Sequence, residues 1–519
     1  MAEKLLCLWQ MPRLINTSPT CLPIISEDPG NMADGEKFLN KPILWVILGS
    51  ALLATAYIIS VSHLYSGSAA VYYAFNLSFM CLLLLCYPRP RSYAYLFFAV
   101  FLFLGFWVKF TVHNVIAYEF IEPTGDFDGQ PETWDLALKA ASAAAIGVCL
   151  PRILQLALAF TPRFQFQTVS RQNIAGWYLE WRIWLWAMSF FLIVAFCIWN
   201  YKAAFYQIGV DAKVILPLHL NVFVSMLTHS GFIMWVCVLV HVEEQIRHLT
   251  PIALMLPFWL EGLFVSISAL SRSLFIFHVA PVVAVFWFQS SKYIKRLNLR
   301  TVLYIVVFLV IALAASITAV TFGRIETYYM EQTSAETYNR KVSNPVDQNE
   351  LRRFLVHDSF RQVLKLFVDR WVGLEGVLTI SAYNHRGIPL LSEAIREDPQ
   401  RGAESIYQKI SASHTHYPRH SNHTFLTLPG IAAVLFYSDS IVIVAIGMLL
   451  ASTILIIMEF IIFRLSQNHF LVAYLGLALA NILCQLNFPY LGGVNVALVF
   501  SAAMAMALIQ RRLAFPYKP

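Results

Sequence analysis

The sequence predicts an all-α membrane protein that crosses the bilayer many times. Of its 519 residues, 58% are hydrophobic and only 13% are charged, whereas soluble domains carry about 25% charged residues. The apolar residues gather in separate runs, each near the roughly 20 residues that a helix needs to cross a bilayer. A long polar insert, residues 323–425, interrupts this pattern late in the chain. The net charge of +7 comes from loops between the runs, so it does not indicate nucleic-acid binding.

Twelve apolar runs predict about twelve transmembrane helices. They cover residues 43–62, 69–87, 94–118, 136–160, 183–205, 222–241, 252–270, 274–288, 302–321, 441–463, 470–487 and 493–509. The chain is thereby divided into an N-terminal tail (1–40), nine helices (41–322), a large loop that ends in a re-entrant helix (323–440), three helices (441–510) and a C-terminal tail (511–519).

Lysine and arginine indicate which loops face the cytoplasm, because basic residues are retained on that side. Such residues gather in every second predicted loop, and the alternate loop 119–135 is strongly acidic. With twelve spans, the basic loops and both termini fall on the cytoplasmic side. The large loop then lies on the opposite, extracytoplasmic side of the membrane.

The large loop contains a predicted amphipathic helix that starts near Glu350. Its apolar residues recur at steps of three and four. Arg353, His357 and Arg361 stand four residues apart on another face, where their side chains stack, and Arg352 lies beside them. Two interpretations remain open: a helix on the membrane surface with its cations toward lipid headgroups, or a basic ladder that guides an anionic ligand.

Further polar candidates follow this helix. In the segment 369–376, two glycines allow a close turn that brings Arg370 near Glu375. That pair is either a simple salt bridge or part of a catalytic site. Trp371 stands beside Arg370, and Arg386 lies in a polar turn a few residues later.

The loop closes with a histidine cluster that contains His414, His416, His420 and His423. No metal is expected there, because the spacing matches no familiar zinc site and Pro418 prevents one continuous helix from aligning the rings. A single histidine that acts as a base fits better, since its pKa is naturally near neutral. The apolar run that follows is interrupted by Pro-Gly and predicts an interfacial or re-entrant helix.

Ionisable residues inside apolar runs are costly and are therefore functional candidates. Arg272 lies where two spans meet at the outer face, where it either extends its charge to the interface or binds a ligand. Lys109 and His113 are one helical turn apart, so they point the same way into the bundle. Glu261 lies in the middle of a span and can pair with a cation.

These motifs together resemble one family. Ser-Arg-Ser at 271–273 opens a span, the large external loop comes late in the chain, and His-Thr-x-x-x-Leu-Pro-Gly at 423–430 is followed by Tyr-Ser-x-Ser at 437–440. The arrangement resembles the oligosaccharide repeat-unit polymerases of bacterial O-antigen and exopolysaccharide assembly, whose general plan O-antigen ligases share. It departs from that pattern at Asp439, where a glycine-rich turn is expected, and it lacks two matched arginine-rich external loops.

The resemblance implies a glycosyltransferase of the bacterial inner membrane whose large loop lies in the periplasm. Such enzymes transfer a glycan from an undecaprenyl-diphosphate carrier to a hydroxyl of another lipid-linked repeat unit, without a cofactor. The implied partners are that lipid-linked glycan, the lipid bilayer, and a chain-length regulator and a flippase of the same pathway. The alternatives are an O-antigen ligase with the same donor, or a transporter or flippase of lipid-linked glycans, although the internal symmetry typical of transporters is not seen.

Residue types suggest how the roles are divided. Arginine suits the departing diphosphate, because its planar guanidinium binds phosphate oxygens and keeps its charge. We expect Arg272 in this catalytic role and His423 or His420 as the base, with Glu375 as the alternative base. The remaining candidates bind substrate by charge or by stacking on sugar rings: Arg352, Arg353, Arg361, Arg370, Arg386, His416, Trp371 and Tyr417.

Overall fold

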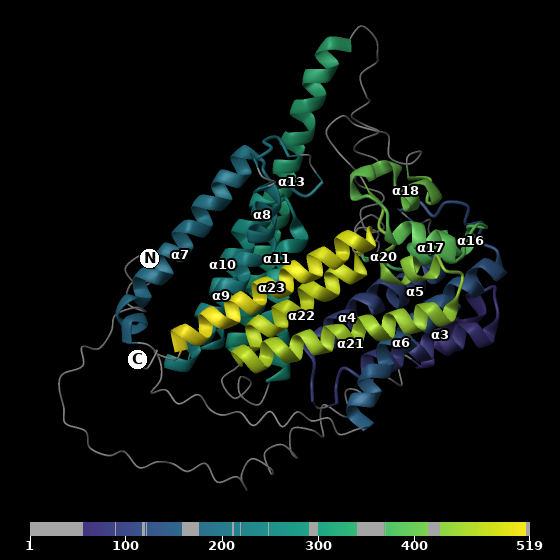
Figure 1. Ribbon diagram of the computed structural model, residues 1–519, viewed down its shortest axis with the longest axis horizontal. Coiled ribbons are helices and arrows are strands. Elements are labelled where there is room, and N and C mark those ends of the chain that lie inside the picture. Colours follow the sequence, from purple (N-terminus) through teal and green to yellow (C-terminus); the bar gives the residue numbers. More distant parts are fainter. Residues whose placement is uncertain are drawn as a thin grey trace. The chain divides into compact units, whose positions relative to one another are not determined.

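The computed structural model describes the following parts of the chain: residues 55–88, 90–116, 120, 122–157, 176–209, 212–217, 220–247, 249–289, 299–339, 368, 370–413 and 426–514, with side chains in the helix at 299–339 described for 303–323. Contacts divide the chain into two units, Met1–Ala56 and Tyr57–Pro519. The packing and the sites considered below belong to the second unit. Its described residues form helices joined by turns, with no strand among them (Figure 1).

Eight helices in the described part are long and apolar enough to cross a membrane: Tyr93–Ile116, Pro131–Ala157, Gly176–Ala203, Leu220–Ile246, Pro251–Ser268, Leu303–Gly323, Ile441–Ser466 and Pro489–Leu513. Four apolar helices are shorter: Thr55–Leu64, Ala69–Leu84, Arg272–Phe288 and His469–Cys484. Each of the twelve predicted spans overlaps one of these helices, although the first begins outside the described residues. The prediction of an all-α membrane protein is confirmed.

Figure 1 labels the elements in chain order. The first group comprises α3 (Ala69–Leu84), α4 (Tyr93–Leu102), η2 (Phe103–Val108), α5 (Lys109–Ile116), α6 (Pro131–Ala157), α7 (Gly176–Ala203), α8 (Leu220–Met226), η5 (Leu227–Gly231) and α9 (Phe232–Ile246). The second comprises α10 (Pro251–Ser268), α11 (Arg272–Phe288), α13 (Leu299–Asn339), α16 (Leu374–Ala382), α17 (Ile388–Ile395), η7 (Pro399–Glu404), α18 (Ile406–Ile410), α20 (Gly430–Phe436), α21 (Ile441–Ser466), α22 (His469–Cys484) and α23 (Pro489–Ala514).

Side-chain caps fix where several apolar helices begin. Ser92 accepts a hydrogen bond from the Tyr95 amide at 3.1 Å at the start of α4. Thr250 accepts one from the Ala253 amide at 3.3 Å at the start of α10. Such caps satisfy amides that have no partner inside the helix. A short polar residue ahead of an apolar run therefore sets the helix start.

Two of the long helices contain a π-helical segment. In Tyr93–Ile116 the segment is η2, and Lys109 follows it directly; in Leu220–Ile246 it is η5, which contains His229. A π-helical segment shifts the backbone hydrogen bonds by one residue and often marks a functional position. Both segments therefore adjoin an ionisable residue within an apolar helix.

The described part of the large loop packs onto the long helices. α16 contacts α6 and α20, and α20 contacts α21 and α22. The C-terminal helices α21, α22 and α23 lie side by side (Figure 1). The loop helices are therefore held against the helices that precede and follow them in the sequence.

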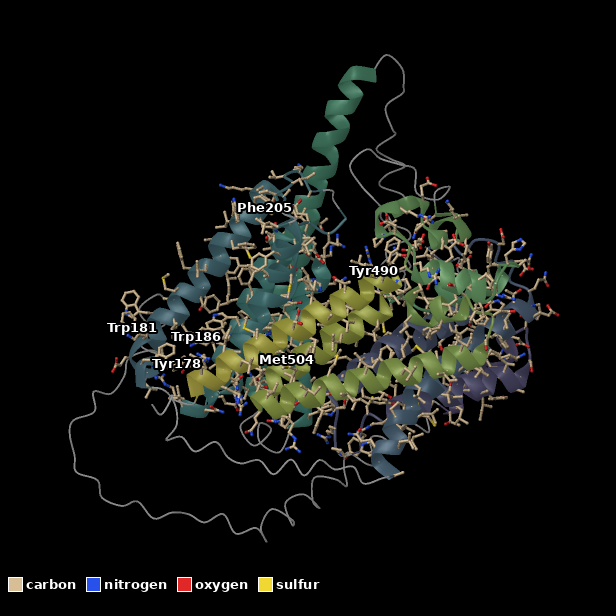
Figure 2. The ribbon with its side chains drawn as sticks, in the orientation of Figure 1. Tyr178, Trp181, Trp186, Phe205, Tyr490 and Met504 are labelled. Atoms are coloured by element: carbon tan, nitrogen blue, oxygen red, sulfur yellow. The ribbon has the colours of Figure 1, made fainter. Side chains whose placement is uncertain are left out.

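Large apolar side chains are exposed on the surface of α7. Trp181, Trp184 and Phe191 are 59%, 65% and 66% exposed, and Figure 2 shows Trp181 projecting outward. Contiguous exposed apolar surface is rare on soluble monomers, while a helix within lipid needs it. This face therefore supports contact of α7 with a membrane.

Candidate functional site at the junction of the loop and the helices

Arg272 is the first residue of α11 and lies ahead of the predicted span 274–288. A tight turn positions it: Leu270 has φ +50°, and the Ser271 amide donates to the Ser266 carbonyl at 2.9 Å. Its Nη2 donates to Thr321 Oγ1 on α13 at 3.0 Å. Within the described part of the chain, Nε of Arg272 is buried and has no hydrogen-bond partner. The guanidinium is thus fixed at one end and keeps donor capacity at the other.

Arg370 lies close enough to Arg272 for their charges to interact. Arg272 is partly buried, and the positive charge of Arg370 acts on its guanidinium. Among the residues that the structure describes, no carboxylate forms an ion pair with either arginine. Two neighbouring guanidinium groups without a counterion attract an anion, and phosphate oxygens match their geometry. We call Arg272 and Arg370 the arginine pair.

Glu375 lies in the first turn of α16 and forms an ion pair with Lys109, the first residue of α5. Both side chains are buried, at 5% and 1% exposure. The sequence suggested that Glu375 approaches Arg370; the structure instead pairs it with Lys109. The expectation that Lys109 and His113 point into the bundle is confirmed, since both are buried. The pair fastens a loop helix to an apolar helix.

Trp371 packs against the same helix as this ion pair. Its ring stacks on Phe101 with centroids 5.7 Å apart and planes 29° apart. Its Nε1 is buried and lacks a hydrogen-bond partner among the described residues. Phe101 therefore occupies one face of the ring that was expected to stack on a sugar.

Arg386 connects the end of α16 to the turn between α20 and α21. It donates to the carbonyls of Ile380, at 3.0 Å, and of Ser381. Its Nε lies 2.9 Å from Oδ1 of Asp439. Asp439 has φ +59°, in the left-handed region that usually favours glycine. This ion pair gives the aspartate a partner at a position whose backbone usually favours glycine.

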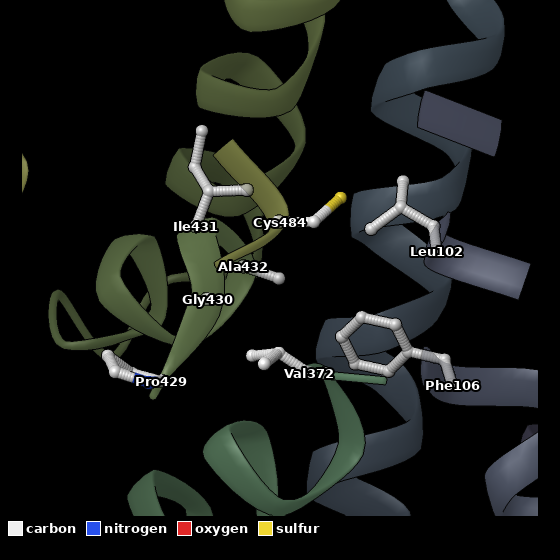
Figure 3. A pocket seen from close by; sticks show the side chains of 9 residues that line it. Leu102, Phe106, Val372, Pro429, Gly430, Ile431, Ala432 and Cys484 are labelled. Carbon is white, nitrogen blue, oxygen red and sulfur yellow. The ribbon is translucent and has the colours of Figure 1, made fainter. Parts of the chain in front are cut away.

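A small apolar pocket lies between the loop and the helices (Figure 3). In Figure 3, Leu102 and Phe106 face Val372 and the segment 429–432. The lining residues are Leu102, Phe106, Val372, Gly373, Pro429, Gly430, Ile431, Ala432 and Cys484. Its lining offers no charge to an anion, and its space is too small for a lipid chain.

Glycines allow close backbone contacts between the segments that surround this pocket. A Cβ on Gly105 would lie 2.2 Å from the Val372 carbonyl oxygen, and one on Gly376 would lie 2.1 Å from that of Pro429. Gly430 has φ +75° and opens α20. The sequence expectation of a short helix after Pro-Gly is met by α20, which is largely buried.

Several predicted site residues lie outside the described residues. They are Arg352, Arg353, Arg361, His416, Tyr417, His420 and His423. The described part brings Arg272 within the range of the charge on Arg370, while Trp371 packs on Phe101 and Glu375 pairs with Lys109. Arg386 belongs to the neighbouring turn and is engaged by backbone carbonyls and Asp439.

Sequence reasoning missed several ionisable residues within apolar helices, among them Glu459, His229 and His278. Glu459 lies within α21 and accepts hydrogen bonds from the amides of Tyr93 and Ala94 at 2.8 and 2.9 Å. His229 and His278 lie within α8–α9 and α11. The sequence contained a signal for them, because each is an ionisable residue that interrupts an apolar run. Such a residue is a candidate functional residue by default.

The fold and the site define a polytopic, all-helical membrane protein with a basic pair beside an apolar pocket. Comparison with protein families, with curated proteins and with solved structures gives no match.

Proposed function

We propose that this protein is a membrane glycosyltransferase that polymerises a surface polysaccharide. It would transfer an oligosaccharide from an undecaprenyl-diphosphate carrier to a hydroxyl of another lipid-linked repeat unit, as the resemblance to repeat-unit polymerases implies. The observation that carries the proposal is the arginine pair, which has no carboxylate counterion among the described residues. An anion is the ligand that such a pair binds best.

The apolar surroundings of the arginine pair favour one class of anion. Arg272 opens α11, which is an apolar helix, and Trp371 beside Arg370 packs on Phe101 of another apolar helix. An anion bound at such helices can keep a hydrocarbon tail in contact with lipid. A lipid diphosphate has that construction, whereas a free sugar phosphate does not. The position of the pair therefore supports a lipid-linked donor over a soluble one.

The proposed reaction replaces one bond to the anomeric carbon with another. The acceptor hydroxyl attacks that carbon, and the bond from carbon to the diphosphate oxygen breaks. Both electrons of this bond leave with the lipid diphosphate, and a base takes the hydroxyl proton. The arginine pair would stabilise the charge that develops on the leaving oxygens. His423 or His420 would act as the base, while the ion pair with Lys109 favours a positioning role for Glu375.

We also infer that all twelve apolar helices cross the inner membrane, with both termini in the cytoplasm and the large loop in the periplasm. The alternation of basic and acidic loops supports this topology. Cysteines introduced at the exposed positions Asp128 and Arg247, in a background without native cysteines, test it. A membrane-impermeant maleimide should label the first and not the second when the outer face alone is accessible; the reverse pattern would refute the topology.

Substitution of the arginine pair tests the function in cells. Arg272→Ala and Arg370→Ala should each shorten or abolish the surface polysaccharide and leave single repeat units on the carrier. A loss of roughly 100-fold or more is expected, because a donor aimed at the leaving group contributes about that factor. Polysaccharide length on gels and carrier-linked glycan by mass spectrometry are the measurements.

Arg396→Ala is the matched control, since Arg396 is an exposed arginine of the same segment. It should leave polymer length unchanged. Normal polymer in both variants of the arginine pair would overturn the proposal. Long carrier-linked chains in those variants would indicate a ligase instead, and repeat units retained on the cytoplasmic face would indicate a flippase.

A further inference from the structure

A second polar cluster joins α10, α11, α22 and η5. Glu261 and His278 are fully buried, and His278 Nδ1 lies 2.6 Å from Glu261 Oε2. On its other side, His278 Nε2 lies 3.3 Å from the carbonyl oxygen of His229. Tyr474 donates to the same carbonyl at 2.7 Å and lies 3.1 Å from the Ser230 hydroxyl. Helices distant in sequence thus meet at one buried imidazole.

The hydrogen-bond partners of the two His278 ring nitrogens indicate one protonation state. A carbonyl oxygen only accepts, so the contact with His229 places a proton on Nε2 of His278. Nδ1 and Oε2 would repel each other at 2.6 Å if both presented lone pairs, so a second proton lies between them. The pair is therefore neutral overall, either as a carboxylic acid beside a neutral imidazole or as a carboxylate beside an imidazolium. Loss of this proton would leave an unpaired negative charge in an apolar region, which is costly.

The cluster is not saturated with hydrogen bonds. In the described part of the chain, Oε1 of Glu261 and Nδ1 of His229 are buried without a partner. A closed structural network would satisfy both atoms, because leaving buried polar atoms unpaired is expensive. His229 also lies in the π-helical segment η5, where the backbone departs from the regular helix. The site therefore keeps two positions that can accept or pass on a proton.

The neighbouring groups do not offer a competing cation. The thiols of Cys197 on α7 and Cys237 on α9, with the Tyr474 phenol on α22, are close enough for Glu261 to act on their charge. α13 contributes the Ser316 hydroxyl, which lies 2.5 Å from that of Ser266 on α10. Among these described neighbours, His278 is the basic side chain that hydrogen-bonds to the Glu261 carboxylate. The groups suit a proton as the ligand.

We propose that Glu261 and His278 form a binding site for one exchangeable proton within the helical bundle, with Nδ1 of His229 as a position through which that proton can pass. The site is separate in its residues from the arginine pair and does not depend on the proposed glycosyl transfer. Proton uptake there would change a net charge of minus one to zero at the meeting point of four elements. Such a change alters the packing of α10, α11 and α22 without any contact with substrate.

Infrared difference spectroscopy on the full chain in lipid vesicles tests the proposal. Beside the bands of the other acidic residues, spectra recorded across the accessible pH range should contain a carboxyl or carboxylate stretch of Glu261 that changes with pH and shifts in deuterated water. Glu261→Gln keeps the size and an acceptor oxygen, and it should remove this band. His278→Gln should shift the band to a different pH. His229→Asn should keep the band and slow its response to a pH jump.

Glu459→Gln is the matched control, because Glu459 is another buried carboxylate within an apolar helix and is held by the Tyr93 and Ala94 amides. It should leave the band in place. An unchanged band in Glu261→Gln would overturn the proposal, and so would the lack of any pH-dependent band from Glu261. If Glu261→Gln fails to fold, the His278→Gln result decides: an unshifted band refutes the site.

Discussion

Lys109 and Glu375 each carry a charge into a region from which water is excluded, so each depends on the other. Their exposures are 1% and 5%. Removing one partner of such a pair leaves an uncompensated buried charge, whereas replacing both with apolar groups is often neutral or stabilising. The ion pair therefore fastens α16 to α5 only while both members are present.

Lys109→Met should destabilise the folded protein by about 3–5 kcal/mol, because it removes the cationic partner of the buried Glu375 carboxylate. The melting temperature of the purified protein in detergent, followed by tryptophan fluorescence, should fall. The double variant Lys109→Met/Glu375→Leu should recover most of this loss.

The double variant also separates two roles of Glu375. If Glu375 only positions α16, the double variant regains activity together with stability. Stability without activity would instead assign Glu375 to the catalytic machinery. A Lys109→Met variant that melts like the wild-type protein would contradict the structural account of the pair.

Sequence reasoning at the residue scale succeeded where spacing within one helix carries the information. Lys109 and His113 were expected to share a face because they are four residues apart, and both are buried. Glu261 was expected to pair with a cation, but its partner His278 could not be named, since the two lie on different helices. The same limit applies to Glu375 with Lys109 and to Arg386 with Asp439.

At the scale of the elements, close backbone contacts decide where the loop meets the helices. Gly105 in η2 leaves room for the Val372 carbonyl, to which a Cβ would come within 2.2 Å. A backbone carbonyl cannot move aside as a side-chain end can. The segment between Arg370 and α16 therefore depends on a glycine in an apolar helix.

Gly105→Ala should destabilise the protein by about 1–3 kcal/mol through overpacking, and it should move Arg370 away from Arg272. Melting temperature and polysaccharide length should both fall. Gly493→Ala is the control, because a Cβ there meets nothing within 4 Å. In a helix interior this change should gain about 0.5–1 kcal/mol. Equal melting temperatures for the two variants would contradict the close approach.

The sequence predicted the apolar helices well because length and hydropathy alone define them. It also predicted a short helix after Pro429, where Pro-Gly interrupts the run, and α20 begins at Gly430. The π-helical segments η2 and η5 could not be predicted, since they change the hydrogen-bond pattern without changing the apolar composition. Contacts between helices, such as that of α21 with α6, likewise cannot be predicted from hydropathy.

At the scale of the whole molecule, polar groups gather at particular positions among the apolar helices. The arginine pair lies beside an apolar pocket, and the Glu261–His278 pair lies among α10, α11 and α22. The described chain forms no cluster of three or more metal-binding side chains. The arginine pair and its apolar surroundings support our proposal of an amphiphilic anion as the substrate, and the glycan part of the proposal rests on the resemblance to repeat-unit polymerases.

Direct transfer by the purified full chain is the most direct test of this function. The protein in lipid nanodiscs would receive a polyprenyl-diphosphate-linked repeat unit, and the products would be measured by mass spectrometry. We predict carrier-linked glycans lengthened by whole repeat units, with one free polyprenyl diphosphate released per transfer. The Arg396→Ala control should match the wild-type protein, and Arg272→Ala and Arg370→Ala should lose this activity. Lengthened products of equal amount in all four proteins would contradict the role given to the arginine pair, and no lengthening by the wild-type protein would contradict the proposed function.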